Sequence, residues 1–152
     1  MNNRTEWRRG DFAISDDHAR VDVDVVWNYL KRSYWAEGIP RDIVERAIAN
    51  SLNFGLYRGG EQIGFARVIT DYATFAYVAD VFVLEEFRGQ KLAVWLMECV
   101  AAHPRLQGLR NIMLGTRDAH ALYEKTGFAR LAIPECWMQR LDPDVYRRAA
   151  TR

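Results

Sequence analysis

The stretch from Tyr77 to Ala101, YVADVFVLEEFRGQKLAVWLMECVA, changes its hydrophobic period in the middle. Residues Tyr77–Leu84 are apolar at nearly every position, with only Asp80 interrupting, which is typical of a strand covered on both faces. From Lys91 onward the apolar residues have helical spacing, so a buried strand is predicted to run into a helix through residues 85–90. Such a turn directs unpaired N–H groups and the positive end of the helix dipole toward one point, which is typical of an anion site.

The turn at residues 85–90 carries two features of a phosphate-binding loop. Arg88 supplies a permanent positive charge, and Gly89 allows the backbone to bend or to approach a ligand closely. An ordinary strand-to-helix connection with a surface arginine would contain the same two residues. The choice between the two interpretations therefore depends on the neighbouring sequence.

The segment RGQKLA, from Arg88 to Ala93, resembles the pyrophosphate-binding signature R/Q-x-x-G-x-G/A of the GNAT superfamily of acyl-CoA-dependent N-acyltransferases. Arg88 and Ala93 match its first and last positions, whereas Lys91 stands where the family has glycine. The overlapping VFVLEEFRG resembles the family's central strand and its exit, with Glu85 where many members have proline. The turn thus keeps the first and last defining positions of the signature and changes the middle one.

A second signature of the same family is similar to ALYEKTGF, from Ala121 to Phe128. In the family this is a short helix that carries a tyrosine and ends in a glycine turn, and Tyr123, Gly127 and Phe128 stand at the matching positions. The resemblance extends from about Ile63 to Leu141, with the order of elements unchanged. It implies an α+β fold of the GNAT type: a mainly antiparallel central sheet, helices on both faces, and one parallel strand pair that splays apart to admit the pantetheine of the cofactor.

Hydrophobic periodicity and turn residues predict the other elements. Asp22 is expected to cap a helix whose apolar face reaches Tyr34, and Pro40 to begin a second helix. Gly59-Gly60 is expected to join two strands of a hairpin beside the central strand. A later strand is expected to run parallel to Tyr77–Leu84, because a whole helix separates the two. The predicted strands are Asp11–Ser15, Asn53–Arg58, Glu61–Thr70, Asn111–Gly115, Phe128–Ile133 and Cys136–Leu141.

Length and composition limit the class of protein. The 152 residues are expected to form a single domain, with residues 1–10 and 142–152 flexible because both ends are polar and basic. The net charge of +1 does not support a nucleic-acid or membrane partner. No apolar run is long enough to span a bilayer and the polar first residues do not form a signal peptide, so a cytoplasmic location is expected. Cys99, Cys136 and the three histidines lack the spacing of a metal site, so no metal is expected.

The resemblance implies acetyl-CoA as the acyl donor. Backbone groups of the central strand would bind pantetheine, and N–H groups of the turn would bind pyrophosphate. Tyr123 stands at the position of the family's general acid, which protonates the departing thiolate. Thr116 and Asp118 precede the short helix at Ala119–Lys125, where family members approach the cofactor, although a helix cap explains Asp118 equally well. The residues implied for the cofactor are Phe82, Val83, Arg88, Gly89, Gln90, Lys91, Leu92, Ala93, Thr116, Asp118 and Tyr123.

The sequence does not assign the base that accepts the amine's proton. Asp80 is the ionisable residue within the central strand, where it is either this base or a structural carboxylate held by a partner. By alternation Asp80 faces away from Tyr77 and Ala79, so the three residues line one pocket only if the strand bulges. Glu85 and a water relay are the rival candidates for the base.

Aromatic residues supply the candidates for an acceptor site. Tyr34 and Trp35 lie at the break after the first helix and Tyr77 lies on the central strand, and together they would suit a small, partly apolar or cationic amine. The predicted function is transfer of an acetyl group from acetyl-CoA to a primary amine of a small molecule by direct attack. The alternatives are a non-catalytic acyl-CoA-binding regulatory module and an acetyltransferase acting on protein lysines or N-termini. Dimers are common in the family, so a homodimer is compatible with the resemblance.

Overall fold

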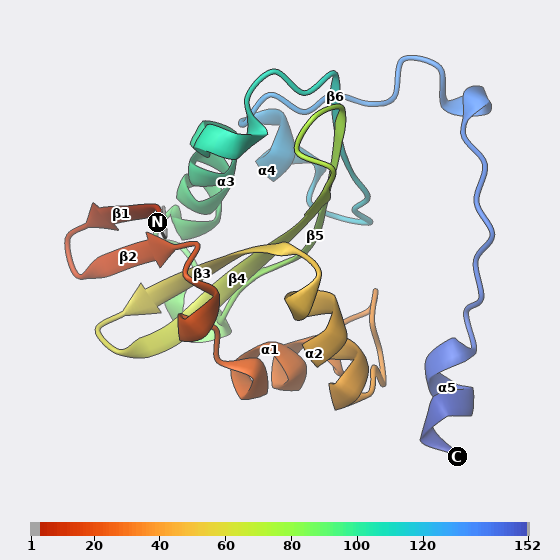
Figure 1. The fold of residues 1–152 in the computed structure, drawn as a ribbon, viewed down its shortest axis with the longest axis horizontal. Coiled ribbons are helices and arrows are strands. Elements are labelled where there is room, and N and C mark those ends of the chain that lie inside the picture. Colours follow the sequence, from red (N-terminus) through yellow and green to blue (C-terminus); the bar gives the residue numbers. More distant parts are fainter. Residues whose placement is uncertain (1–3, 152) are drawn as a thin grey trace.

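A computed structural model of the chain describes residues 4–151 and contains one six-stranded sheet (Figure 1). Its strands are β1 (Glu6–Arg9), β2 (Phe12–Ser15), β3 (Leu52–Arg58), β4 (Glu61–Thr70), β5 (Phe75–Val83) and β6 (Asn111–Leu114). They lie side by side in chain order, antiparallel from β1 to β5 and parallel between β5 and β6. This topology confirms the mainly antiparallel sheet with one parallel pair, and the hairpin formed by β3 and β4.

Helices cover both faces of the sheet, as predicted. The α-helices are α1 (Val23–Leu30), α2 (Arg41–Ala49), α3 (Leu92–Ala102), α4 (His120–Glu124) and α5 (Val145–Ala150). Single turns of 3₁₀ helix occur at His18–Arg20, Glu85–Phe87, Pro104–Leu106 and Pro134–Cys136. Figure 1 shows α1 and α2 on one side of the sheet and α3 and α4 on the other, and each pair packs on its own apolar core. None of the helices in residues 4–151 is long and apolar enough to cross a membrane.

Helix α1 begins where predicted but ends earlier. Asp22 caps it by accepting hydrogen bonds from the backbone N–H groups of the first turn. At the other end, Ser33 donates its hydroxyl to the carbonyl of Leu30 at 2.7 Å and accepts a hydrogen bond from a later N–H group, so the chain turns away from the helix axis. Tyr34 and Trp35 therefore lie in the loop between α1 and α2 and not on a helical face.

Strand β5 contains a β-bulge at Asp80. Phe65 of β4 pairs with Phe82, but Arg67 pairs with Ala79, so two residues of β5 oppose one residue of β4 between these pairs. The backbone of Asp80 is left-handed, with φ of 56°, a conformation that aspartate tolerates better than most residues. The bulge breaks the strict alternation of the strand, which is the condition under which Asp80 reaches the same pocket as its neighbours.

The N-terminal ten residues, expected to be flexible, include the edge strand β1, which pairs with β2 from Glu6 to Arg9. Asp16 fixes the start of this hairpin, because one carboxylate oxygen accepts the N–H of Thr5 at 2.7 Å and the other contacts the buried ring of His103 at 2.7 Å. Residues 1–3 lie outside the described part of the chain. At the other end, the segment expected to be flexible forms α5 up to Ala150.

The strands predicted at Phe128–Ile133 and Cys136–Leu141 do not form, and this prediction is wrong for the single chain. The chain instead leaves the body of the molecule after α4, and residues 129–141, the C-terminal arm, run along its outside to α5 (Figure 1). A strand needs a neighbour to satisfy its backbone N–H and C=O groups, and no described residue of the chain pairs with the arm. The apolar pattern predicted strands, but it did not show that this segment lacks the neighbour that a strand requires.

Candidate active site

The parallel pair β5 and β6 opens at its carboxyl end. Their pairing ends at Val78 and Leu114, whereas β5 continues to Val83 beside β4. The last residues of β5 therefore have no strand partner on the β6 side within the described chain. Phe82 and Val83, the residues implied for pantetheine, belong to this unpaired stretch. Free backbone groups along such an edge are able to hydrogen-bond an extended ligand.

The turn between β5 and α3 has the backbone geometry of an anion-binding loop. Gly89 has φ of 82°, and Lys91, the N-cap of α3, is left-handed with φ of 61° and ψ of 22°. No described side chain caps α3, so its first N–H groups have no side-chain partner, and the helix dipole favours negative charge there. Gly89, Gln90 and Lys91 are all exposed. This arrangement fits the anionic pyrophosphate implied for residues 88–93.

Arg88 is held beside this turn by contacts with α1 and β5. Its Nη2 donates to the hydroxyl of Tyr29 at 2.9 Å, and its Nε donates to the carbonyl of Val83 at 3.3 Å. The ring of Tyr29 in turn stacks on Phe82, with ring centroids 4.0 Å apart. Tyr29 therefore positions the cation of Arg88 at the start of the turn, a role that the sequence did not reveal.

Glu85, a rival candidate for the base, is engaged in an ion pair. Arg32 donates to both of its carboxylate oxygens, at 2.8 Å and 3.4 Å. These hydrogen bonds, with the nearby positive charges of Arg32 and Arg88, lower the pKa of Glu85 to about 2. A carboxylate with so low a pKa is a weak proton acceptor at neutral pH.

Tyr123, the residue implied as general acid, lies on α4 and is buried. Burial raises the pKa of its phenol to about 12, and the neighbouring Tyr34 and Asp118 add to the rise. The phenol therefore stays protonated at neutral pH, which a proton donor requires. Its ring packs edge-on against Phe128, with centroids 6.0 Å apart, so the second signature folds as one unit.

The start of α4 is stabilised by Thr116. Its hydroxyl accepts a hydrogen bond from the N–H of Ala119 at 3.0 Å, whereas the side chain of Asp118 is exposed and lies 3.9 Å from Arg117. The predicted helix cap at Asp118 is wrong, because the cap position falls on Ala119 and has no side-chain hydrogen bond. Thr116 and Tyr123 both line a cleft of about 1140 Å³ beside α3, β6 and α4.

A pocket of about 340 Å³ lies between the sheet and helices α1 and α2. Trp35 and Tyr77, two of the three residues predicted for the acceptor, line this pocket. Tyr34 does not line it but packs edge-on against Trp35, with centroids 5.1 Å apart, and its hydroxyl accepts the N–H of Arg117 at 2.9 Å. A Cβ added at Gly115 would lie 3.6 Å from the hydroxyl of Tyr77, so Tyr77 reaches from the pocket to the end of β6.

The carboxylate of Asp80 has a partner on each oxygen. Arg67 donates from Nε to Oδ2 at 2.7 Å, and Trp35 donates from Nε1 to Oδ1 at 3.0 Å. Arg67 also donates to the hydroxyl of Ser51 at 3.1 Å. The side chains of Arg67 and Asp80 are only 16% and 11% exposed, so the ion pair is largely shielded from water. Because of the bulge, Asp80 lines the same pocket as Tyr77.

Two polar residues that line this pocket, Arg67 and Tyr146, were not predicted. A signal for Arg67 existed, since it interrupts the apolar run of β4 as Asp80 interrupts that of β5, and opposite charges in neighbouring buried strands favour pairing. Tyr146 reaches the pocket from α5, near the end of the described chain. The residues next to it in the sequence are mostly polar, so the sequence did not indicate that it lines a pocket.

Comparison with known proteins places the chain in one family. The Acetyltransferase (GNAT) family model matches residues 23–128, more than half of the chain, so the chain belongs to the GNAT acetyltransferase family. A protein of Gibberella zeae, named as a candidate acetyltransferase, is 34% identical over 78% of this chain and 79% of its own length.

Solved structures give the same result. A candidate GNAT acetyltransferase from Xanthomonas campestris is 46% identical, with a TM-score of 0.86 over 89% of this chain and 96% of that chain. A candidate acetyltransferase from Clostridium acetobutylicum, solved with acetyl-CoA, is 15% identical, with a TM-score of 0.61 over 93% of this chain and 96% of that chain. At this low identity the second similarity concerns the fold alone.

Lys91 occupies the left-handed position that explains why the family has glycine there. Replacing it with glycine removes about 1 kcal/mol of backbone strain from the folded state. Glycine also raises the conformational entropy of the unfolded chain, which costs a similar free energy on folding, so stability should change little. We expect Lys91→Gly to weaken acetyl-CoA binding two- to five-fold, because an exposed lysine–phosphate pair contributes about 0.5–1 kcal/mol. Titration calorimetry measures the change. Lys91→Asn, which also tolerates a positive φ, is the matched control and should weaken binding equally; tighter binding in both variants would mean that the lysine only crowds the site.

Proposed function

We propose that the chain is an N-acetyltransferase that moves the acetyl group of acetyl-CoA to a primary amine of a small molecule by direct attack. One observation carries this proposal: the unpaired end of β5 borders both the anion-binding turn and the pocket. Phe82 and Val83 lead into the turn, whereas Ala79 and Asp80 line the pocket. A donor and an acceptor bound at these two places would thus share one strand, and such proximity is a main source of rate enhancement.

The donor site is assigned to residues of the turn and of β5. Arg88 and the N–H groups of residues 88–93 bind the pyrophosphate, and the free backbone groups of Phe82 and Val83 bind the pantetheine. When bound, acetyl-CoA supplies the acetyl group as an activated thioester. Tyr123 keeps its proton at neutral pH and donates it to the departing thiolate. Membership of the GNAT acetyltransferase family supports this choice of donor.

The acceptor site is the pocket that Trp35 and Tyr77 line, and its size suits a small molecule. We assign Asp80 as a positioning residue, because one of its oxygens accepts a hydrogen bond from Arg67 and the other accepts one from Trp35. The amine then attacks in its neutral form after losing its proton to water. We expect the reaction to take place in the cytoplasm.

Thermal unfolding with and without acetyl-CoA tests the donor. Acetyl-CoA at about 100 times its dissociation constant should add roughly 2.7 kcal/mol to the free energy of unfolding and raise Tm clearly. A screen of small primary amines for release of free thiol then tests transfer. Absence of a shift at millimolar acetyl-CoA would contradict the donor site, and a shift without thiol release from any amine would favour the non-catalytic module.

A further inference from the structure

The pocket between the sheet and helices α1 and α2 has an apolar side and a polar side. The two helices and the loop between them line it with hydrocarbon, through residues that include Val26, Leu30, Ile39, Ile43, Val44 and Ile48. Strands β4 and β5 contribute polar groups, those of Arg67, Tyr77 and Asp80. A molecule that fits both sides has an apolar body and a polar end.

Arg67 keeps one guanidinium nitrogen without a partner. Its Nε donates to Asp80, and its Nη1 donates to the hydroxyl of Ser51. Nη2 makes no hydrogen bond to any residue between 4 and 151, and it is not one of the fully enclosed unpaired side-chain atoms of that range. It therefore keeps access to open space beside the pocket that Arg67 lines. Because two hydrogen bonds hold the guanidinium in place, its free N–H groups are already oriented for a ligand.

A carboxylate is the ligand group that suits this nitrogen. Arg67 and Asp80 together carry no net charge, and their side chains are only 16% and 11% exposed. A ligand without an acceptor would displace water from Nη2 and leave it unpaired, which is costly in a shielded site. A protonated amino group and a carboxylate add one charge of each sign, so the charges can alternate from the ligand carboxylate through Arg67 and Asp80 to the ligand amine.

The amino group of such a ligand would lie where β5 and β6 part. The pairing of these strands ends at Val78, and the next residues, Ala79 and Asp80, line the pocket. The guanidinium of Arg67 reaches the same point, since its Nε lies 2.7 Å from Asp80. The places for the carboxylate and for the amine are therefore neighbours. This closeness fits two groups on one carbon atom and not two groups at opposite ends of a long molecule.

We propose that the acceptor is an α-amino acid with an apolar side chain, whose carboxylate binds Arg67 and whose side chain packs against α1 and α2. The inference rests on the proposed acetyl transfer and names the substrate class of the same pocket. The pocket volume of about 340 Å³ is near the lower end of the range for ligand pockets, about 300–1,000 Å³, as a single amino acid requires. A protein lysine has no carboxylate near its amine, and a polyamine would place its second charge against hydrocarbon.

The transfer would convert the amino acid into its N-acetyl derivative. The neutral α-amino nitrogen forms a bond to the acetyl carbon, and the bond from that carbon to sulfur breaks. The nitrogen loses one proton to water, and the departing thiolate takes a proton from Tyr123, which water then restores. One free thiol therefore appears for each amino acid acetylated, and this thiol is the quantity to measure.

Thiol release from matched amines tests the substrate class. Both enantiomers of leucine and phenylalanine are compared with isoamylamine and phenethylamine, which lack only the carboxylate, and with leucinamide, which keeps the carbonyl but not the charge. For the preferred amino acid, kcat/KM should exceed that of its analogues about 10- to 100-fold. Equal or faster release from the analogues, or release only from other amines, would overturn the inference and leave the acetyl transfer standing. Release from no amine at all would overturn both.

Arg67→Lys separates carboxylate binding from a purely structural role. Lysine keeps the positive charge beside Asp80 but lacks the fork that reaches both Asp80 and a ligand. For the amino acid, kcat/KM should fall at least about ten-fold more than for the analogue without a carboxylate, and calorimetric titration of the amino acid should show the same loss of affinity. Equal losses for the two substrates would mean that Arg67 only supports the fold, which would overturn the inference.

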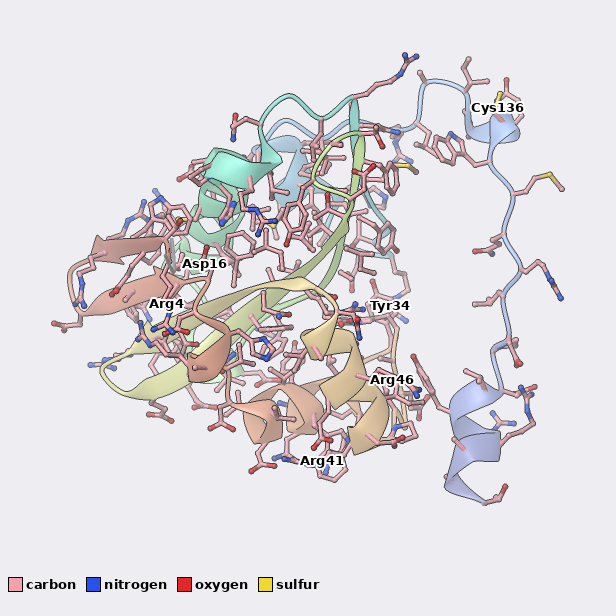
Figure 2. The ribbon with its side chains drawn as sticks, viewed as in Figure 1. Arg4, Asp16, Tyr34, Arg41, Arg46 and Cys136 are labelled. Atoms are coloured by element: carbon pink, nitrogen blue, oxygen red, sulfur yellow. The ribbon has the colours of Figure 1, made fainter. Side chains whose placement is uncertain are left out.

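Arg46→Lys is the matched control for this variant. Arg46 is an exposed residue of α2 (Figure 2) and does not line the pocket. The control should change neither the kinetics nor the affinity for the amino acid. A loss in Arg46→Lys equal to that in Arg67→Lys would contradict a specific role of Arg67.

Ile43→Ala tests the apolar side of the pocket. The smaller side chain leaves more room between α1 and α2, so kcat/KM for phenylalanine relative to leucine should rise about three- to ten-fold. Val25→Ala is the matched control, because Val25 packs against the same apolar core but does not line the pocket, and it should leave this ratio unchanged. An unchanged ratio in Ile43→Ala, or the same change in both variants, would contradict the placement of the side chain against the helices.

Discussion

Tyr123→Phe should lower kcat about 100-fold or more while the affinity for acetyl-CoA changes by less than about two-fold. The substitution removes only the phenolic oxygen, and the ring continues to pack on Phe128. The thiolate then leaves without a nearby proton donor, which raises the barrier for the chemical step and leaves binding of the donor intact. Steady-state kinetics with the amine that gives the fastest thiol release, together with calorimetric titration of acetyl-CoA, measures both quantities.

Tyr57→Phe is the matched control for this experiment. Tyr57 is buried on β3, burial likewise raises its pKa to about 12, and its hydroxyl has no hydrogen-bond partner among the described residues. Removing that hydroxyl should leave kcat unchanged and stability equal or slightly higher, because an unsatisfied buried polar group is removed. Full activity of Tyr123→Phe would reject its assignment as the acid, and equal losses in both variants would indicate a general effect of buried tyrosines.

The pH dependence follows from the same pKa. A general acid works while it is protonated, and a folded-state pKa of about 12 keeps Tyr123 protonated throughout the range in which enzymes are assayed. The rate should therefore rise with pH as the amine loses its proton, and should reach a plateau without the alkaline decline that an acid of ordinary pKa near 10 would cause. A decline centred near pH 8 would point to a different donor.

Local patterns in the sequence predicted those parts of the site that depend on contiguous residues. The strand, turn and helix around Arg88 and the short helix of Tyr123 were predicted because hydrophobic period, glycine position and helix length are all local signals. The backbone of Lys91 is left-handed, which explains why the family has glycine at this position. The sequence alone indicated only that Lys91 departs from the family signature. The roles of these residues in catalysis stay predictions.

Features that depend on the pairing of distant segments were missed. Alternation alone placed Asp80 on the opposite face from Tyr77, and only the register of β4 against β5 reveals the bulge. The partnership of Asp80 with Arg67 depends on the same register. The predicted strand at Cys136–Leu141 failed for a related reason, because an apolar pattern indicates that a segment needs a neighbour but does not identify that neighbour.

Arg67→Met should destabilise the chain by about 3 kcal/mol, because it leaves the carboxylate of Asp80 largely buried without its cation. Methionine keeps most of the side-chain volume, so loss of charge and not a cavity dominates the effect. Arg8→Met is the matched control: Arg8 pairs with Glu6 at 2.8 Å, but its side chain is 78% exposed, and it should cost less than about 0.5 kcal/mol. Urea unfolding followed by tryptophan fluorescence measures both values. Equal costs would mean that the buried Arg67–Asp80 pair contributes no more stability than the exposed Arg8–Glu6 pair.

Asp80→Asn completes the comparison and also tests the role of the carboxylate. Asparagine tolerates the positive φ at this position and can still accept the hydrogen bond from Trp35, so the variant removes charge alone. Combined with Arg67→Met, it should recover about 1–2 kcal/mol relative to the sum of the single variants, because the double variant contains no unpaired charge. If Asp80 positions Trp35 and Arg67, Asp80→Asn should raise KM for the amine and leave the pH profile of kcat unchanged. If Asp80 is the base, kcat should instead fall about 100-fold or more and its acidic limb should disappear.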